Sequence, residues 1–474
     1  MIVLRIRPGH ARGTVAAPAS KSQLHRALIA AALSEGESRI NRTDGPAFSE
    51  DILATIDCLK ALGCEIVPGD SAITVRGMGK DRRVVPAENT TDKKEQTPLI
   101  LPVRASGSTL RFLIPLVLSL GHPVRFVGEK SLFERPLTVY EELCQQYGMT
   151  FRRGETKEEA FLDICGRKEE NASVISSPAG SGQPGPEYTR LEPMAITIDS
   201  HISSQFVTGL LFALPLFPGG GRIELIQPIV SRPYIEMTRQ ILERFGIRTC
   251  WEKKAIQERE AIQERETLLI PGGQHYTAAN ISIEGDESQA AFLKAIPLLD
   301  PESEITITNL DPETLQGDRR FDEMARSILE QDPQEDGPQK ENLREEPAPI
   351  DLSDTPDLGP ILFALAAACG RGGTFMGTAR LRGKESDRIR AMAEELDKFG
   401  MQTKTGEDSF TILPGRLQTP EEPLDGHGDH RIVMALVVLL IRTGGVIQGT
   451  EAVNKSDPAF FERIASLGIQ IEPV

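Results

Sequence analysis

The sequence has few of the residues that mark several common classes of protein. Its six cysteines never form a C-x-x-C pair, which argues against a zinc site and a disulfide framework. The longest purely apolar run, Ile432–Ile441, is far shorter than the roughly 20 residues of a membrane span. The 53 basic residues are outnumbered by 69 acidic ones, and a net charge of −16 argues against nucleic acid as a partner. The first residues lack the layout of a signal peptide, so we expect a cytoplasmic protein without membrane contact.

The remaining composition is that of an ordinary globular protein. Apolar residues make up 39 % of the 474 residues, which excludes disorder of the whole chain. At roughly 100–200 residues per domain, this length predicts two large domains or three smaller ones. A chain of this size buries enough apolar surface to fold without a disulfide or a structural metal.

An amphipathic stretch that ends in glycine and continues into a short apolar segment recurs along the chain. Glycine after a helix supplies a left-handed backbone conformation that other residues adopt only at a cost. We therefore expect a helix before, and a strand after, each of Gly63, Gly148, Gly246, Gly400 and Gly468. The interval between Gly246 and Gly400 is much longer than the others, and we expect a degenerate sixth copy near residues 326–330.

Six apolar runs of helix length alternate with these stretches. Several are apolar on nearly all sides, which indicates helices buried inside a domain. Short segments such as 195–200 and 281–286 read as strands between them. We therefore predict an α/β protein of six repeats, with the helices inside and the strands outside. The six runs are residues 22–33, 108–121, 204–216, 288–299, 358–370 and 430–444.

Four polar segments interrupt the repeats, and we expect them to be surface insertions. One of them contains the hexamer AIQERE twice in succession, for which a solvated helix and a hairpin loop are both open. Another carries an excess of acidic residues and accounts for part of the negative net charge. The four segments are residues 81–98, 168–192, 255–266 and 331–346.

Basic residues stand near the starts of the apolar helices. Helix N-termini hold unpaired N–H groups and a partial positive charge, and arginine adds a fork that matches two oxygens. An acidic protein with basic residues at these places is predicted to bind small, highly charged anions. Asp357 and Glu385 lie among them and are candidates for proton transfer. The basic residues are Lys21, Arg26, Arg135, Lys384, Arg388, Arg431 and Lys455.

Each of these residues also has an ordinary structural interpretation. Arg388 and Glu385 fit a surface ion pair at i,i+3, and Asp357 fits a helix cap. Lys21 and Arg26 fit a solvated helix face. However, the same polar-then-apolar layout recurs with a different basic group each time, and this repetition favours the anion-binding hypothesis.

Ten motifs follow one another between Pro18 and Phe461: PASKSQLHRALIAAAL, SGSTLRFLIP, ERPL, SSQFVTGLL, SRPYIEMT, LQGDRRF, DTPDLGPILFALAA, RLRGKESDRI, GDHRIVMAL and NKSDPAFFE. In this order they resemble the 5-enolpyruvylshikimate-3-phosphate synthase family. The resemblance implies two similar domains, each of three βαβαββ units around buried helices, an arrangement called an inside-out barrel. It also implies that residues 20–283 form the first domain, and that residues 1–19 and 284–474 form the second.

The same resemblance implies a reaction. Members of this family transfer the enolpyruvyl group of phosphoenolpyruvate to the 5-hydroxyl of shikimate 3-phosphate and release phosphate. This is the sixth step of the shikimate pathway to chorismate and the aromatic amino acids. The transfer is an addition followed by an elimination, with no cofactor and no metal. We expect these two small molecules as partners, and we expect a monomer, as family members generally are.

Matching the motifs carries the family's site residues over to this sequence. Lys21 is expected to contact both substrates and to act in catalysis, with Asp357 as the base at the hydroxyl and Glu385 as the acid at the methylene. Shikimate 3-phosphate is expected to bind Lys21, Ser22, Arg26, Ser203, Ser204, Gln205, Ser231, Tyr234, Asp357 and Lys384. Phosphoenolpyruvate is expected to bind Lys21, Gly107, Arg135, Gln205, Arg388, Arg431 and Lys455.

The sequence departs from the family pattern in two places. Many members have Asn where this chain has Ala105, and Ser108 stands for a Thr. One side-chain contact to phosphoenolpyruvate is therefore expected to be lost, while the backbone contact of Gly107 remains. Arg380 stands where some members present Asn to shikimate 3-phosphate, which puts that contact in doubt.

Two other functions fit parts of the sequence. The related transferase family that acts on UDP-N-acetylglucosamine shares the fold and phosphoenolpyruvate, but it typically uses a mobile-loop cysteine as its acid. No cysteine lies between Cys64 and Cys144 here. A non-catalytic protein that binds phosphorylated metabolites would need the cationic residues alone, and it is disfavoured because both Asp357 and Glu385 are present.

Overall fold

The computed structural model divides into two compact units. Residues 21–42 and 50–283 form one, here called the central unit, and residues 1–20, 43–49 and 284–474 form the other, here called the terminal unit because it holds both chain ends. The structure describes residues 2–43, 45, 47–79, 97–118, 123–157, 159–165, 194–199, 203–258, 261–330 and 348–474. No helix within these ranges is long and apolar enough to span a membrane.

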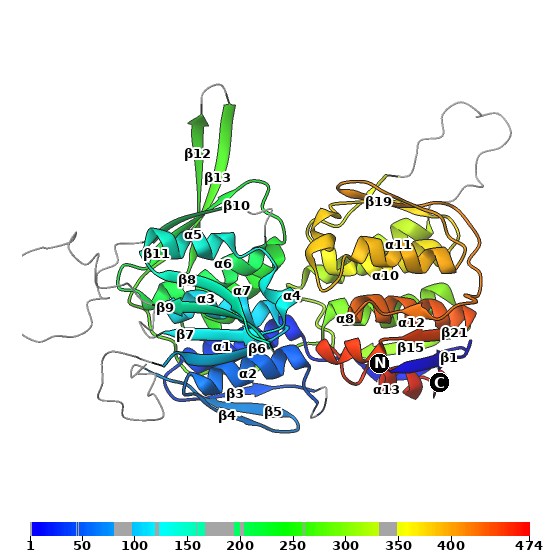
Figure 1. The fold of residues 1–474 in the computed structure, drawn as a ribbon, viewed down its shortest axis with the longest axis horizontal. Helices are drawn as coiled ribbons and strands as arrows, with labels where there is room; N and C mark the ends of the chain where they lie inside the picture. Colours follow the sequence, from blue (N-terminus) through cyan, green and yellow to red (C-terminus); the bar gives the residue numbers. More distant parts are fainter. Residues whose placement is uncertain are drawn as a thin grey trace, which may run out of the picture. The chain divides into compact units, whose positions relative to one another are not determined.

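The central unit contains three four-stranded sheets that share one plan (Figure 1). The strand order of the first sheet is β14 (Asn280–Ser282), β3 (Glu37–Asn41), β5 (Ala72–Arg76) and β4 (Glu65–Pro68). The second sheet has the order β6 (Leu99–Arg104), β7 (Val124–Gly128), β9 (Ala160–Cys165) and β8 (Thr150–Glu155). The third has the order β10 (Met194–Asp199), β11 (Gly221–Ile226), β13 (Ala261–Ile270) and β12 (Cys250–Glu258). In each sheet the first two strands are parallel and the remaining pairs are antiparallel. Burial alternates along β10, which is the pattern of a sheet with one face on the core.

The terminal unit repeats this plan twice and shortens it once. The two full sheets are β16 (Ile350–Asp351), β17 (Gly373–Met376), β19 (Ser409–Ile412) and β18 (Thr403–Thr405); and β20 (Leu424–Asp425), β21 (Gly445–Gln448), β1 (Val3–Ile6) and β22 (Ile471–Pro473). The short one is the parallel pair β15 (Glu304–Thr308) and β2 (Arg12–Ala16). The predicted six-repeat α/β architecture is therefore confirmed, and the degenerate copy is the one with two described strands.

Both predicted series of helices form. The apolar runs are α1 (Lys21–Leu33), α3 (Gly107–Leu118), α6 (Ser204–Ala213), α8 (Glu287–Leu299), α10 (Gly359–Ala368) and α12 (His430–Thr443). The amphipathic stretches are α2 (Glu50–Ala61), α5 (Thr138–Gln146), α7 (Arg232–Arg244), α9 (Phe321–Leu329), α11 (Arg388–Lys398) and α13 (Phe460–Ser466). Each of the five predicted glycines has a positive φ, from 66° at Gly148 to 100° at Gly63. The helix ends are therefore capped as the spacing predicts.

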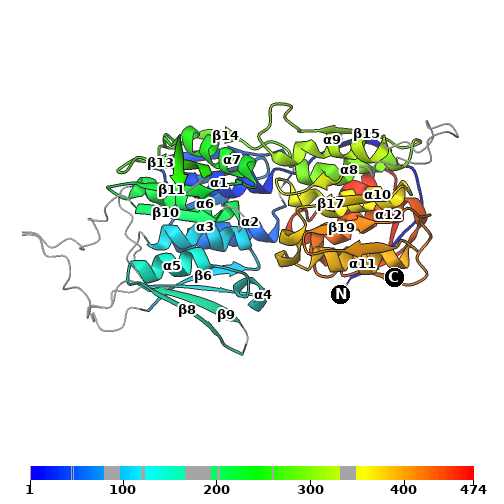
Figure 2. The same cartoon turned by 90° about the horizontal axis from the view of Figure 1, so that it is seen from above.

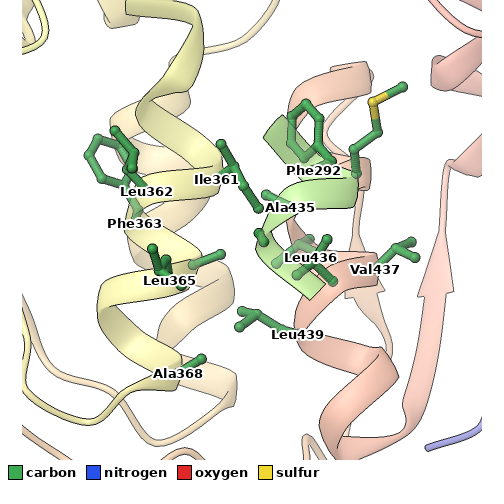
Figure 3. Packing of buried hydrophobic residues seen from close by; sticks show 14 of the residues in the cluster. Phe292, Ile361, Leu362, Phe363, Leu365, Ala368, Ala435, Leu436, Val437 and Leu439 are labelled. Atoms are coloured by element: carbon green, nitrogen blue, oxygen red, sulfur yellow. The ribbon is translucent and has the colours of Figure 1, made fainter. Parts of the chain in front are cut away.

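The apolar helices form the core of each unit. Figure 2 shows α8, α10 and α12 side by side in the terminal unit, with α9 and α11 toward its surface. In the close view of Figure 3, Ile361 and Leu365 of α10 and Leu439 of α12 lie between their helices, and Phe292 of α8 packs beside them. All residues of α10 are buried. This burial explains why the runs are apolar on nearly all sides.

The tandem hexamer forms part of a β-hairpin and not a helix. Residues 255–258 belong to β12 and residues 261–266 to β13, and the two copies pair along an antiparallel hairpin from Ala255–Glu264 to Glu258–Ala261. Figure 1 shows this hairpin extending beyond the rest of the central unit. The prediction of a hairpin is therefore confirmed and that of a helix is wrong, because residues of the first hexamer pair as a strand with residues of the second. The other three polar segments, predicted as surface insertions, lie almost entirely outside the described residues.

Candidate active site

Arg26 of α1 is a buried cation surrounded by neutral groups. It is 2 % exposed, and it donates to the Thr238 hydroxyl (Nε–Oγ1 2.8 Å) and to the carbonyl oxygens of Ser22 (2.7 Å) and Tyr234 (3.3 Å). Within the described part of the chain it has no carboxylate partner. Burial lowers its pKa to about 10, so it stays charged at neutral pH. A guanidinium in this setting is suited to bind an anion.

Lys21 begins α1 and pairs with Asp51 of α2 (Nζ–Oδ2 2.8 Å), with its own side chain 18 % exposed. The interpretation of Lys21 and Arg26 as a solvated helix face is therefore wrong. Asp51 was not among the predicted site residues. The two partners stand 30 residues apart on different helices, so the sequence alone gives no signal that joins them.

The predicted serines lie at the N-termini of α6 and α7. Ser203 caps α6, and its hydroxyl accepts from the N–H of Gln205 (3.2 Å). Ser231 precedes α7 with a φ of +56°, a left-handed conformation that is costly for a residue with a side chain. Tyr234 follows in the first turn of α7, where its carbonyl accepts from Arg26. The structure thus brings Ser231 and Tyr234 to the part of α1 that carries Ser22 and Arg26.

Gly107 is the first residue of α3, and two guanidinium groups approach it. A Cβ at this position would lie 3.1 Å from Arg135 Nη1 and 3.2 Å from Arg111 Nη1. The side chain of Arg135 has no hydrogen bond or ion pair to any described residue, and its Nε is buried. Gly107 therefore opens a helix N-terminus between two cations, which is favourable for an anion.

Arg111 is a residue that the sequence reasoning missed. Its Nη1 donates to Gln205 Oε1 (2.8 Å), and Gln205 Nε2 donates to the Ser108 hydroxyl (3.0 Å). The carboxamide of Gln205 is thereby held between two residues of α3. Arg111 stands four residues after Gly107, one helical turn away, and this spacing was a signal that could have identified it.

In the terminal unit, Asp357 lies among three cations. Its carboxylate is 2.9 Å from Arg388 Nη1, 3.3 Å from Lys384 Nζ and 3.2 Å from Arg431 Nη2. Arg388 is 1 % exposed and also contacts Glu385 (2.7 Å) and Asp429 (2.8 Å). The cluster joins residues from η5 (Pro356–Leu358), α11 and α12. The structure thus gathers five of the predicted residues around one point.

The charges of this cluster set the pKa of Asp357. Burial acts to raise it, but Arg431, Lys384 and Arg388 outweigh burial and hold the pKa of Asp357 well below its usual value. Burial lowers the pKa of Lys384, which Asp357 partly opposes. Asp357 is therefore an ionised carboxylate at neutral pH.

Asp429 is a second residue that the sequence reasoning missed. It caps α12 by accepting from the N–H of Arg431 (2.9 Å), and it is fully buried against Arg388. Arg431 in turn donates to the Ser288 hydroxyl of α8 (3.0 Å). The GDHR motif contained the signal, because Asp before a helix is a common cap. Lys455 ends η7 (Thr450–Lys455) rather than starting a helix, and no described carboxylate pairs with it.

The ordinary interpretations of the terminal-unit residues are wrong. The Arg388–Glu385 pair exists but is buried instead of exposed. Asp357 caps no helix, since the residue that precedes α10 is Leu358 and no side chain caps it. Over the described ranges, no group of His, Cys, Asp and Glu is placed to hold a metal.

A family model described as EPSP synthase (3-phosphoshikimate 1-carboxyvinyltransferase) matches residues 7–464. The chain belongs to the EPSP synthase family. A 3-phosphoshikimate 1-carboxyvinyltransferase of Clostridium kluyveri is 35 % identical to it over 475 residues, covering 100 % of this chain and 99 % of that one. One of Clostridium novyi is 32 % identical, covering 98 % and 97 %.

Solved structures show the same fold. EPSP synthase from Acinetobacter baumannii matches with a TM-score of 0.70 at 22 % identity and covers 100 % of both chains. The enolpyruvyl transferase NikO from Streptomyces tendae matches with a TM-score of 0.65 at 15 % identity, covering 100 % of this chain and 98 % of that one. The predicted two-domain enolpyruvyl transferase fold is therefore confirmed.

Membership of the EPSP synthase family also confirms the predicted enzyme class and reaction. The protein is a transferase that moves the enolpyruvyl group of phosphoenolpyruvate to shikimate 3-phosphate in aromatic amino acid biosynthesis.

Proposed function

We propose that each unit of this EPSP synthase supplies residues to the transfer, with binding and proton transfer divided between them. In the central unit, Ser22, Arg26, Ser203, Ser204, Ser231 and Tyr234 bind shikimate 3-phosphate, Gly107 and Arg135 bind phosphoenolpyruvate, and Lys21 and Gln205 contact both. In the terminal unit, Asp357 and Lys384 bind shikimate 3-phosphate, and Arg388, Arg431 and Lys455 bind phosphoenolpyruvate. Lys21 also acts in catalysis by offsetting the negative charge of both substrates.

The observation that carries this proposal is the position of Asp357. It is an ionised carboxylate within 3.3 Å of Lys384, Arg388 and Arg431. A base that removes the proton of the 5-hydroxyl must be ionised before it acts. The oxygen of that hydroxyl then bonds to the enol carbon of phosphoenolpyruvate, and a carboxylate surrounded by anion-binding groups is placed for this step.

The low pKa of Asp357 makes it a weak base as long as it faces three cations. The same cations are the proposed ligands of the substrate phosphate and carboxylate groups. When Arg431 and Lys384 bind these anions, less positive charge acts on Asp357, and its pKa rises toward the usual value. The base therefore becomes stronger when the substrates are bound.

Glu385 is the proposed acid. Arg388 contacts three carboxylates, those of Asp357, Glu385 and Asp429. Glu385 lies 2.7 Å from Arg388, a proposed ligand of phosphoenolpyruvate, so its carboxyl group is close to where that substrate is proposed to bind. We assign Glu385 the proton that goes to the methylene carbon of phosphoenolpyruvate. Loss of a proton from the resulting methyl group, together with phosphate, restores the double bond.

The departures from the family pattern fit this assignment. Arg380 donates to the carbonyl oxygen of Ser353 (3.2 Å), so its guanidinium supports the loop before Asp357. Ala105 is buried and offers no polar group. Neither Arg380 nor Ala105 is therefore assigned a side-chain contact with a substrate.

We further propose that the enzyme acts in the cytoplasm as a monomer. Its domains are residues 20–283, and residues 1–19 with 284–474. These boundaries lie within one residue of those of the compact units, except that residues 43–49 group with the terminal unit.

Turnover with both substrates tests the proposal. Phosphate release should require shikimate 3-phosphate and phosphoenolpyruvate together and should match the amount of enol ether formed. UDP-N-acetylglucosamine in place of shikimate 3-phosphate should give no phosphate. The residue assignment is wrong if Asp357→Asn and Glu385→Gln turn over at the wild-type rate.

A further inference from the structure

A chain of buried hydrogen bonds runs behind Gly107, on side chains to which the proposed mechanism gives no role. His25 Nδ1 lies 2.8 Å from Thr55 Oγ1, and Thr55 Oγ1 lies 2.7 Å from Thr109 Oγ1. Thr109 Oγ1 then donates to Ser106 Oγ at 2.7 Å. These four residues are at most 1 % exposed. The chain therefore ends, inside the protein, at the residue immediately before Gly107.

The chain connects three helices of the central unit. His25 belongs to α1, Thr55 to α2 and Thr109 to α3. Thr109 Oγ1 also lies 3.4 Å from the carbonyl oxygen of Asp51, whose carboxylate pairs with Lys21. Two of the proposed phosphoenolpyruvate ligands of the central unit, Lys21 and Gly107, are therefore connected to this network.

Ser106 Oγ fixes the start of α3 because it also accepts from the N–H of Thr109 (3.3 Å). This second bond is long, so the 2.7 Å bond from the Thr109 hydroxyl is the stronger restraint on the Ser106 side chain. Residue 105 is an alanine and gives the turn no side-chain hydrogen bond. Two backbone bonds, Ser106 N–H to Val103 O (2.9 Å) and Leu110 N–H to Ser106 O (3.1 Å), hold the same turn. The Thr109 hydroxyl adds a side-chain restraint next to the Gly107 N–H.

We propose that Thr109 is a positioning residue for phosphoenolpyruvate, holding the 105–108 turn so that the Gly107 N–H faces the ligand. This inference rests on the proposed role of Gly107. A structural role alone would lower the stability of the fold, whereas a positioning role changes the KM of one substrate in a protein that remains folded.

The test compares Thr109→Val, which keeps the shape but removes the hydroxyl, with Thr109→Ser, which keeps the hydroxyl. A net hydrogen-bond contribution of the usual size predicts that Thr109→Val raises the KM for phosphoenolpyruvate about 3- to 10-fold. The KM for shikimate 3-phosphate should stay within about twofold, and Thr109→Ser should restore the wild-type KM for phosphoenolpyruvate. Ser106→Ala removes the acceptor of the same hydrogen bond and serves if Thr109→Val does not fold.

Thr378→Val is the matched control. Thr378 is a buried threonine of the terminal unit whose hydroxyl has no hydrogen-bond partner among the described residues. This variant should leave both KM values unchanged.

Gly107→Ala separates this inference from the proposed function. If Gly107→Ala raises the KM for phosphoenolpyruvate and Thr109→Val and Ser106→Ala do not, Thr109 is not a positioning residue. If Gly107→Ala has no effect, the placement of Gly107 at the substrate is wrong. An equal rise of both KM values in Thr109→Val would also overturn the inference, because it indicates general damage to the fold.

Discussion

Replacing Gly107 with alanine should weaken phosphoenolpyruvate binding without loss of stability. The backbone conformation of Gly107 does not require a glycine. Gly107 is the first residue of α3 and is not among the positive-φ glycines. Alanine favours a helix over glycine by up to about 1 kcal/mol. The free energy of unfolding should therefore be unchanged or slightly higher in Gly107→Ala.

The expected loss of affinity follows from the two arginines. The new Cβ would lie 3.1 Å from Arg135 Nη1 and 3.2 Å from Arg111 Nη1. Carbon and nitrogen atoms this close must separate by a few tenths of an ångström, and the methyl group also covers the N–H beside them. A lost charge-assisted hydrogen bond costs about 1.5–3 kcal/mol. We therefore expect the KM for phosphoenolpyruvate to rise about 10- to 100-fold.

Steady-state kinetics with each substrate varied in turn, together with thermal unfolding, measure this effect. The KM for shikimate 3-phosphate should change less than about twofold, because its proposed ligands lie on other helix starts. Gly63→Ala is the matched control in the same unit: Gly63 has a φ of +100° and open space around it, so alanine there is strained and lowers stability but not affinity. Gly107→Ala with a wild-type KM for phosphoenolpyruvate would refute the placement of this half-site.

Three further predictions concern the base, a histidine and the hairpin. Asp357→Asn should lower kcat by about 10²–10⁴ while shikimate 3-phosphate still binds, measured by turnover and by calorimetry. The hydrogen bond that His427 Nε2 donates to Glu395 raises the pKa of His427 above its usual 6.5. The stabilisation from this bond is therefore complete below that pH and is lost as pH rises through the raised pKa. The unfolding free energy should therefore depend less on pH in His427→Gln than in the wild type as pH rises from 6.5 through the raised pKa. Deleting residues 255–260 should change the free energy of unfolding by less than about 1 kcal/mol, because the second copy of the hexamer then follows Lys254 directly. A large loss of activity in this variant would show that the hairpin contacts the site.

The repeats were predictable because they follow from local chemistry. Runs such as 430–444 are apolar on all sides, and a helix of this kind is stable in water only when it is buried. The glycines at the helix ends have the positive φ that their position requires. Both signals lie within about 15 residues, and a single sequence contains them completely.

The partners of the site residues were not predictable in this way. The sequence identified Asp357, Lys384 and Arg431 as separate members of three motifs, but the distances between them depend on how helices from different repeats pack. Asp429 and Arg111 were missed for the same reason. Each lies inside a recognised motif, and its role is to hold a residue of another segment, Arg388 or Gln205.

The two half-sites differ in how their cations are balanced, and this difference assigns their tasks. In the central unit, Arg26 and Arg135 have no carboxylate partner among the described residues. An anion that binds these two arginines replaces no ion pair, so the full interaction contributes to affinity, whereas Lys21 of the same unit is already paired with Asp51. In the terminal unit, Arg388 and Arg431 already contact Asp357, and an incoming anion must compete with that carboxylate. The competition reduces the gain in affinity but raises the pKa of Asp357, so binding energy in the terminal unit is used to make the base stronger. We therefore propose that the arginines of the central unit contribute most to affinity and that the terminal unit contributes the proton transfer.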